Sequence, residues 1–327
     1  MTNHATFWDQ ESANRRNSLL LAVLVVLLLG ALGSAIGYAI SGAVEGAVAA
    51  TVIALAIGTL ASLASYFAGD KLVLASSGAK EVTAAEAPQL MNVVQEMSVA
   101  AGVPMPRVYL IDDTAPNAFA TGRDPQHASV AVTSGLLQKL DREELQGVLG
   151  HELSHVRNFD IRFSLMVGVL VGSVALLADF FLRFTFWGGG RGGRSRDRDG
   201  GGGLQAIVFV IAIVLAVVAP IAARLVQLAV SRQREYLADA SSVELTRNPR
   251  GLERALAAIA GDKDVLEVAN RATQHLYFSN PIKKFESRSS SMWSTHPAIV
   301  DRIDRIRSLS GEPVLSDAER QGLTQLG

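Results

Sequence analysis

Four long apolar stretches constrain the fold of this chain more than any other feature of its sequence. Residues 19–40, 46–69 and 204–223 contain no charged side chain, and residues 163–182 contain only Asp179. An apolar helix of about 20 residues can cross the hydrocarbon core of a bilayer and satisfies its own backbone hydrogen bonds there. With 49 % hydrophobic and only 19 % charged residues in the chain, membrane helices are favoured over the alternative, buried core helices of a large soluble protein.

The charges beside the first two stretches predict their orientation. Arg15 and Arg16 precede the first stretch, Lys71 follows the second, and the link around Glu45 has no lysine or arginine. Because basic flanks stay in the cytoplasm, both outer ends of this hairpin are expected there, together with the chain after residue 70. A cleaved signal peptide is the alternative, but the apolar run is longer than a signal sequence needs and a second span follows at once.

The link between the third and fourth stretches does not fit this rule. Residues 181–203 contain five arginines, which would lie outside if both helices cross fully. Either the rest of the protein fixes a full crossing, or the two helices form a hairpin that enters the membrane incompletely. The glycine-rich part is expected to lack fixed structure because it cannot bury enough apolar surface. Poor aromatic interleaving and a net charge of −1 disfavour an RNA-binding tract, so no nucleic-acid partner is expected.

The remaining sequence has the mixed pattern of a globular domain. Residues 86–101 carry apolar side chains at helical spacing before a glycine and a proline, which predicts a helix with its stop signal. Two short β-branched runs, 107–112 and 128–135, are typical of strands. Residues 117–122 between them fit either a third strand or a loop. Asp141 can cap a helix that carries the next motif.

The sequence HELSH at residues 151–155 is the motif with the most chemical content. On a helix His151 and His155 lie one turn apart on the same face, so both imidazoles can bind one ion while Glu152 lies beside it. This is the arrangement of a zinc hydrolase, in which the metal lowers the pKa of its water and the glutamate takes the proton. The chain has no cysteine, so a metal must be held by histidine and carboxylate. The alternative is an exposed helix face whose histidines pair with carboxylates.

A catalytic zinc needs a third protein ligand and one open position. The metzincin motif is excluded because Asn158 and Ile161 stand where it needs glycine and histidine. Glu235 and Asp239 are again one helical turn apart, so Glu235 can bind the metal while Asp239 accepts the N–H of a ligating histidine. A solvated acidic helix face is the alternative interpretation. Spacing also leaves a third histidine open, and the candidates are His127, His275 and His296.

Four sequence motifs and the placing of the apolar stretches together resemble a known family. The motifs HELSH, EYLAD, NAFATG and STHPAIVDRI are similar to those of the HtpX family of bacterial membrane zinc metalloproteases, relatives of the CAAX prenyl endopeptidases. The resemblance implies a gluzincin-like catalytic domain in the cytoplasm, one Zn²⁺ per chain and a multi-pass location in the cell inner membrane. It implies endoproteolysis of misfolded or damaged membrane proteins in envelope quality control. It also favours Glu235 over a third histidine as metal ligand.

The resemblance assigns further roles to single residues. Asn117 is similar to an asparagine that holds the substrate backbone, and its amide offers both a donor and an acceptor; a turn residue after Pro116 is the alternative. His296 resembles a histidine that stabilises the oxyanion of the tetrahedral intermediate, although it could simply begin a helix beside Pro297. Arg302 matches a basic position of the same motif and could be a structural ion pair.

The strand at residues 128–133 is expected to border the active-site cleft. The basis is an analogy with zinc peptidases whose edge strand pairs with an extended substrate. Ala131 in this strand would then bind substrate through main-chain groups, which read shape more than sequence. Broad specificity follows from such binding and suits quality control.

The sequence therefore predicts a predominantly α membrane protein with four hydrophobic helices and a gluzincin-like α+β zinc-peptidase domain with a small β-sheet. Its polypeptide substrates are expected to be mainly membrane proteins, and it could form homo-oligomers. A CAAX-type processing protease and a non-catalytic zinc-binding scaffold or holdase are the alternatives. The predicted boundaries are a cytoplasmic N-terminal segment at 1–18, a transmembrane hairpin at 19–69, a first catalytic part at 70–162, a third helix at 163–182, a Gly/Arg-rich loop at 183–203, a fourth helix at 204–226 and a second catalytic part at 227–327.

Overall fold

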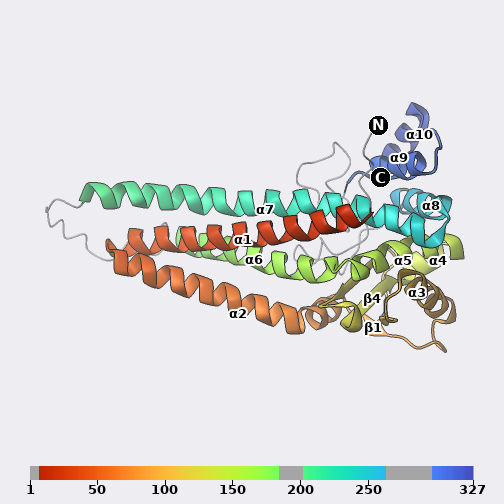
Figure 1. The fold of residues 1–327 in the computed structure, drawn as a ribbon, viewed down its shortest axis with the longest axis horizontal. Helices are drawn as coiled ribbons and strands as arrows, with labels where there is room; N and C mark the ends of the chain where they lie inside the picture. Colours follow the sequence, from red (N-terminus) through yellow and green to blue (C-terminus); the bar gives the residue numbers. More distant parts are fainter. Residues whose placement is uncertain (1–6, 184–201, 263–296, 327) are drawn as a thin grey trace. The chain divides into compact units, whose positions relative to one another are not determined.

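The computed structural model describes residues 7–183, 202–262 and 297–326, and the chain divides into two compact units. The helical unit comprises Ser12–Ser65 and Met166–Gln227, and the mixed unit comprises Met1–Glu11, Tyr66–Leu165 and Leu228–Gly327. In chain order (Figure 1) the elements are α1 (Phe7–Ser41), α2 (Val44–Ser76), β1 (Lys80–Glu81), α3 (Pro88–Ala101), β2 (Arg107–Ile111), β3 (Ala118–Gly122), the short 3-10 helix η1 (Pro125–His127), β4 (Ala128–Thr133), α4 (Ser134–Lys139), α5 (Arg142–Arg157), α6 (Asp160–Arg183), α7 (Gly202–Thr246), α8 (Pro249–Ala260), α9 (Ile299–Leu309) and α10 (Asp317–Leu326). The long helices α1, α2, α6 and α7 contribute residues to both units.

Helices α1 and α2 of the helical unit pack closely through small residues. A Cβ atom on Gly37 would lie 2.3 Å from the carbonyl oxygen of Gly46 and 2.6 Å from the Cβ of Ala50. A Cβ atom on Gly33 would lie 3.0 Å from that of Ala54. Small residues let the backbones of apolar helices approach, so that van der Waals packing can hold the helices together. The two helices therefore form a close-packed hairpin.

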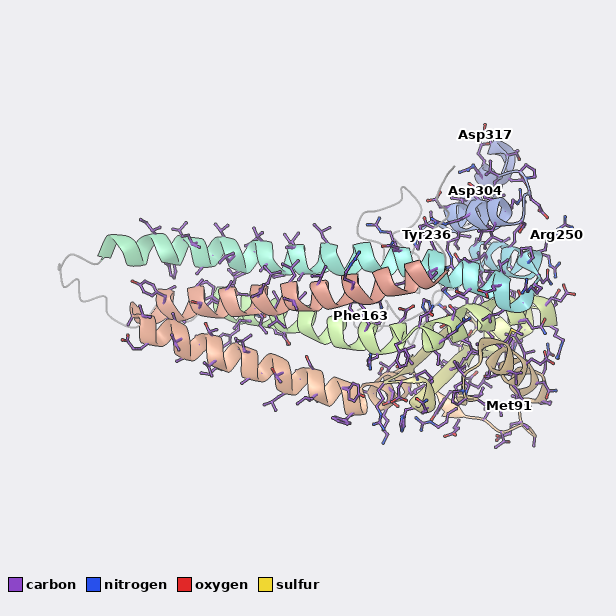
Figure 2. The ribbon with its side chains drawn as sticks, in the orientation of Figure 1. Met91, Phe163, Tyr236, Arg250, Asp304 and Asp317 are labelled. Carbon is purple, nitrogen blue, oxygen red and sulfur yellow. The ribbon has the colours of Figure 1, made fainter. Side chains whose placement is uncertain are left out.

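The outer surfaces of these helices are apolar. Leu27 is 64 % exposed and Leu60 is 66 % exposed, and Figure 2 shows mostly carbon along the long helices but many nitrogen and oxygen tips on the mixed unit. Val23–Ser41 and Val44–Ala64 are long and apolar enough to cross a membrane, and Phe209–Ala223 is a shorter apolar helix. Within the described ranges the structure thus supports two of the four predicted spans, and full crossing by α6 and α7 is not confirmed.

The mixed unit contains a four-stranded sheet in the order β1-β2-β4-β3. β1 pairs with β2, and β3 with β4, in the antiparallel sense, whereas β2 and β4 are parallel. All three predicted runs contain strands, including residues 117–122, for which the pattern left a loop open. Because side chains alternate between the faces of a sheet, Val130 and Val132 face the main core while Ala131 faces a smaller cluster that includes the end of α2.

The prediction that residues 128–133 form the edge strand is wrong. β4 lies between β2 and β3, where Ala131 pairs with Tyr109 on one side and with Phe119 on the other. The main-chain groups of β4 are used within the sheet and Ala131 is fully buried, so this residue cannot pair with a substrate. Among the described strands, β3 forms that edge, because β4 inserts between β2 and β3 after the chain has passed through β3.

Helix α5, which carries the HELSH motif, is the central helix of the mixed unit. It begins as predicted at Asp141, whose side chain accepts a hydrogen bond from the Glu144 N–H while the Glu144 carboxylate accepts one from the Asp141 N–H. α5 packs against α3, α8 and β3, and a Cβ on Gly147 would lie 2.8 Å from the Cα of Leu252 on α8. Most residues after its first turn are buried. The motif is therefore held on a close-packed, rigid helix.

The chain turns between α5 and α6 at Phe159. This residue has a φ of 59°, in the left-handed region that costs a residue with a Cβ atom roughly 1–2 kcal/mol. The turn ends α5 at Asn158 and begins α6 at Asp160. It therefore interrupts the regular helix just beyond the HELSH motif.

Candidate metal centre

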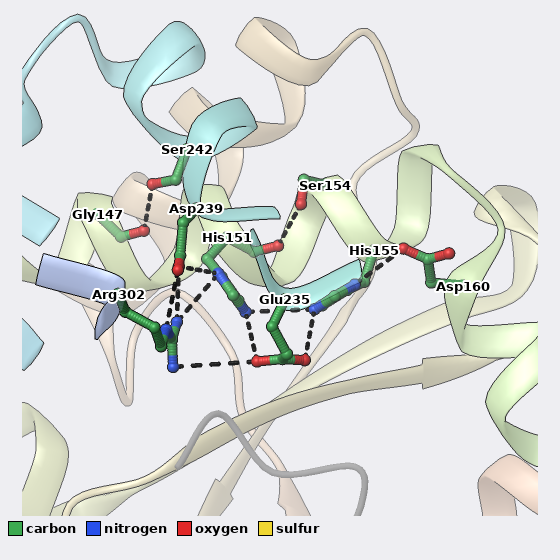
Figure 3. Close-up of polar contacts among 9 residues, drawn as sticks. All are labelled: Gly147, His151, Ser154, His155, Asp160, Glu235, Asp239, Ser242 and Arg302. Atoms are coloured by element: carbon green, nitrogen blue, oxygen red, sulfur yellow. Dashed lines mark hydrogen bonds and ion pairs between the residues drawn. The ribbon is translucent and has the colours of Figure 1, made fainter. Parts of the chain in front are cut away.

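Two histidines and a glutamate from different helices converge in the mixed unit (Figure 3). The Nε2 atoms of His151 and His155 on α5 lie 3.2 Å apart. Each Nε2 atom is 3.6 Å from one carboxylate oxygen of Glu235 on α7. All three ligand atoms lie within 4.8 Å of one another. The structure thus brings together the residues that the sequence predicted as metal ligands.

The donor atoms fit a tetrahedral metal ion. Zinc binds imidazole nitrogen and carboxylate oxygen at about 2.0–2.2 Å, so two ligand atoms of a tetrahedral site lie about 3.3–3.6 Å apart. The two Nε2 atoms, 3.2 Å apart, are close to this requirement, and each lies 3.6 Å from a different oxygen of the Glu235 carboxylate. Among the described residues the group has three members. Three protein ligands are typical of a catalytic zinc site with one position for water, whereas a structural site is normally closed by four.

Each histidine is oriented by a buried aspartate through its other ring nitrogen. Nδ1 of His151 lies 2.9 Å from Oδ1 of Asp239, and Nδ1 of His155 lies 3.0 Å from Oδ2 of Asp160. An ionised carboxylate can only accept a hydrogen bond, so Nδ1 carries the proton and Nε2 keeps the lone pair that binds a metal. The Asp239 contact is the one that the helical spacing with Glu235 predicted.

Each of the two aspartates contacts its own buried arginine. Arg302 on α9 donates to Asp239 through Nε at 2.9 Å and through Nη2 at 2.7 Å, and its Nη1 atom is 3.9 Å from Glu235. On the other side of the site, Nη1 of Arg234 lies 3.4 Å from Oδ1 of Asp160. The basic position noted at residue 302 is thus an ion pair within the site, with its side chain 1 % exposed.

The buried charges around the three ligand atoms leave a deficit of positive charge. Among the described residues, six charged side chains are buried here: the carboxylates of Glu152, Asp160, Glu235 and Asp239 and the guanidiniums of Arg234 and Arg302. Four negative charges against two positive charges leave two negative charges that a buried site must neutralise. A divalent cation, or a proton on each histidine, would balance them.

The pKa values of the two histidines reflect this deficit. Burial opposes protonation, but the hydrogen bonds to Asp160 and Glu235 raise the pKa of His155 to about 10. Burial opposes protonation of His151 as well, but its hydrogen bonds with Asp239 and Glu235 outweigh burial and raise its pKa. Protons therefore compete with a metal ion for the Nε2 atoms of the two histidines.

Glu152 lies on the same turn of α5 as the histidines. It is 2 % exposed and His151 is fully buried, which excludes an exposed helix face as the reason for the motif. Burial raises the pKa of Glu152, while the histidines and a hydrogen bond with the Ala120 backbone on β3 lower it in part. A carboxylate with a raised pKa beside metal ligands is a suitable proton acceptor near neutral pH.

The other residues that the sequence singled out lie apart from this group or outside the described ranges. Asn117 is buried at the start of β3, where its Oδ1 atom accepts a hydrogen bond from the Ala118 N–H at 3.0 Å; its contact with a substrate stays a prediction. Exposed His127 lies 2.7 Å from Asp124 and is not a member of the group. The remaining candidates, His275 and His296, lie outside the described residues.

Two residues of the site, Asp160 and Arg234, were not predicted from the sequence. Arg234 stands next to Glu235 in a helix with several charged residues, so nothing distinguished it from a solvated arginine. For Asp160 the available signal was Asn158, because asparagine is common where a helix ends. A helix end at that position would not by itself have shown which of the following residues contacts the motif.

Comparison with known proteins gives consistent matches over most of the chain. Residues 84–310 match peptidase family M48. A protein named Protease HtpX homolog from Streptococcus gordonii is 42 % identical over 303 residues, which cover 92 % of this chain and 99 % of that protein. A protein of the same name from Listeria monocytogenes serotype 4a is 42 % identical over 309 residues, with the same coverage of 92 % and 99 %. Among solved structures, Ste24p of S. mikatae is similar with a TM-score of 0.47 and 19 % identity, over 76 % of this chain and 56 % of that one.

Proposed function

Because the chain belongs to peptidase family M48 and, within it, to the HtpX proteases, we propose that this membrane metalloprotease is a zinc-dependent endopeptidase that degrades misfolded or damaged membrane proteins. The observation that carries the proposal is the group of His151, His155 and Glu235 beside the buried Glu152. This group combines a set of metal ligands with a proton acceptor, which are the two requirements for hydrolysis of a peptide bond.

In the proposed mechanism His151, His155 and Glu235 hold Zn²⁺. Bound there, zinc supplies Lewis-acid chemistry, because it polarises a carbonyl and lowers the pKa of water toward about 7. Glu152 takes a proton from the attacking water and later gives it to the nitrogen of the leaving amine. The transfer leaves Glu152 ionised again at the end of the cycle.

The surroundings of two carboxylates suit them to different tasks. Burial raises the pKa of Glu152, so this side chain can both accept and return a proton near neutral pH. Burial opposes ionisation of Asp239 as well, but Arg302 holds the pKa of Asp239 below its ordinary value. Asp239 therefore stays ionised, keeps the N–H of His151 in place and does not compete for the catalytic proton.

We place the substrate against β3 rather than against β4. Among the described strands β3 forms the edge of the sheet, and the backbone of Ala120 on this strand contacts Glu152. An extended polypeptide that pairs with β3 through main-chain groups would lie beside the proton acceptor, and such pairing reads shape more than sequence. This suits a protease that must accept many damaged chains. In this arrangement Asn117 would hold the substrate backbone and His296 would stabilise the oxyanion.

The proposed location is the bacterial inner membrane, with the catalytic residues in the cytoplasm. Two apolar helices support an integral membrane protein, and Arg15, Arg16 and Lys71 flank them on what would be the cytoplasmic side. Multi-pass insertion of α6 and α7, oligomerisation and a preference for membrane proteins as substrates belong to the same proposal.

The test compares the detergent-solubilised, zinc-loaded wild type with the Glu152→Gln variant. Zinc content is measured by elemental analysis and proteolysis by cleavage of casein. Because Glu152 is not one of the metal ligands, the variant should keep one zinc per chain. Because the amide cannot take a proton, cleavage should fall by about 100-fold or more.

Glu143→Gln is the matched control, since Glu143 lies on the same helix but is exposed and pairs with Arg254 on the surface. This variant should keep both zinc and cleavage, because exposed ion pairs contribute little to stability. Full cleavage by Glu152→Gln would remove this residue from the mechanism. A wild type that binds zinc but cleaves no polypeptide would favour a non-catalytic scaffold.

A further inference from the structure

We propose that Asp160 is the positioning residue of the metal ligand His155, and that Arg234 holds Asp160 in this position. The inference rests on the proposed metal centre and assigns a role to two residues that the centre itself does not include. It also gives a reason for the left-handed backbone of Phe159 just after the HELSH motif.

The turn at Phe159 is what brings Asp160 to His155. On a continuous α-helix with 3.6 residues per turn, residues five positions apart point about 140° away from each other. An uninterrupted helix would therefore direct Asp160 away from the histidine. The left-handed backbone of Phe159, with a φ of 59°, starts a new helix at Asp160 and allows Oδ2 to lie 3.0 Å from Nδ1 of His155. Strained backbone of this kind is often found at functional sites.

Arg234 fixes the other oxygen of Asp160. Its Nη1 atom lies 3.4 Å from Oδ1, and both side chains are 5 % exposed. The guanidinium carbon lies 3.6 Å from the centre of the Phe163 ring, one helical turn beyond Asp160. The cation is thus enclosed between a carboxylate and an aromatic face of the same helix, which restricts its movement.

This arrangement repeats the one at the other histidine. There Asp239 orients His151 and is itself held by Arg302. Each ligand imidazole therefore has its own aspartate and its own buried arginine, supplied by different helices. Because Arg234 precedes Glu235 directly, α7 provides both the third ligand and the cation that holds Asp160. Such outer contacts fix the ring orientation and the basicity of a metal ligand.

The test measures zinc affinity of the full-length protein in detergent, by competition with a chromogenic chelator at pH 7. The Asp160→Asn variant keeps the shape of the side chain but loses its charge, so zinc should bind about 10- to 100-fold more weakly. Asp124→Asn is the matched control, because Asp124 also contacts a histidine Nδ1 atom, at 2.7 Å, but lies outside the metal group. Zinc affinity of this control should equal that of the wild type.

The visible spectrum of the cobalt-substituted protein separates positioning from general stability. Co²⁺ absorbs according to the geometry of its ligands, so a displaced His155 should change the spectrum of Asp160→Asn and leave that of Asp124→Asn unchanged. Loss of fold alone would remove cobalt binding without producing an altered spectrum. An unchanged spectrum together with wild-type zinc affinity in Asp160→Asn would overturn the inference.

A double variant covers the case in which Asp160→Asn does not fold. The variant that combines Asp160→Asn with Arg234→Met removes the guanidinium together with its counter-charge, so it should fold. It should bind zinc as weakly as Asp160→Asn alone. If the double variant folds and binds zinc like the wild type, the inference is wrong. If the wild type itself binds no zinc, the metal centre fails first, and the two results are therefore distinguishable.

Discussion

Zinc binding should release protons in a number set by the buried charges of the site. The perturbation is the addition of zinc to detergent-solubilised protein that has been stripped with a chelator. Among the residues that the structure describes, four buried carboxylates face two buried guanidiniums, and the raised pKa values of His155 and His151 favour protons as the balancing charges of the metal-free site. A divalent cation displaces such protons. We expect the release of between one and two protons per zinc at pH 7.

The energetic consequence can be worked out from His155. Contacts with Asp160 and Glu235 outweigh burial and raise the pKa of His155 to about 10. Removing this proton at pH 7 costs about 4 kcal/mol, because each pKa unit corresponds to about 1.4 kcal/mol. This cost weakens the apparent zinc affinity about 1000-fold relative to a deprotonated site. Each proton displaced should make the affinity rise about tenfold per pH unit.

The same shifts give the sign of the stability change with pH. A histidine whose pKa is raised in the folded state stabilises the fold fully below its unfolded value of about 6.5. This stabilisation is lost as the pH rises through the folded value, which for His155 is about 10. The metal-free protein should therefore become less stable between these limits, whereas stabilisation by zinc should increase over the same range.

Calorimetric titration in buffers of different ionisation enthalpy measures the number of protons directly. The observed binding enthalpy should depend linearly on the buffer enthalpy, with a slope between one and two protons. A slope of zero, combined with an affinity that does not change between pH 6 and pH 8, would refute the charge balance described for this site. His127→Gln is the control, since His127 is exposed and outside the metal group.

Three further predictions concern a buried ion pair, the packing of two helices and the backbone conformation of Phe159. Arg302→Met should destabilise the protein by about 3–5 kcal/mol, because it leaves the buried carboxylate of Asp239 without its cation; thermal unfolding in detergent checks this, and full stability would contradict it. Gly37→Leu should separate α1 from α2, because its Cβ would lie 2.3 Å from a facing carbonyl oxygen, and should lower the unfolding temperature, whereas Gly172→Ala, with nothing within 4 Å, should not. Phe159→Gly should keep its zinc because glycine adopts a positive φ readily, while Phe159→Val should lose zinc measured by elemental analysis; equal zinc content would contradict a role for this backbone conformation.

The sequence predicted which side chains gather into the candidate metal group because regular helical spacing carries much of the information. His151 and His155 share a helix face, and Glu235 and Asp239 repeat the same spacing on a second helix. A regular helix converts such spacing into geometry without knowledge of the rest of the fold. What spacing could not provide was the choice between Glu235 and a third histidine, since this depends on which helices meet.

The edge of the sheet and the role of Asp160 could not be predicted for related reasons. Strand order depends on which strands pair, and β4 enters between two earlier strands although it follows both in the chain. Asp160 depends on a left-handed residue, for which glycine or asparagine is the usual sequence signal. Phe159 gives no such signal. Prediction therefore failed where tertiary contacts determine local conformation.

The apolar stretches gave a different kind of result. Hydropathy correctly predicted two helices long enough to cross a membrane, and the helices at Val23–Ser41 and Val44–Ala64 satisfy both length and composition. The third and fourth stretches are helical, as α6 and α7 show. Hydropathy alone does not show whether they cross, because the length of an apolar helix does not determine its depth in the bilayer.

The contact between Arg302 and His151 joins residues 151 positions apart in the chain. A ribosome adding about 5–20 residues per second needs roughly 8–30 seconds to proceed from the first to the second. During that interval the nascent chain contains the paired imidazoles but lacks the cation that holds Asp239 beside His151. The complete surroundings of the site can therefore form only after α9 has been synthesised.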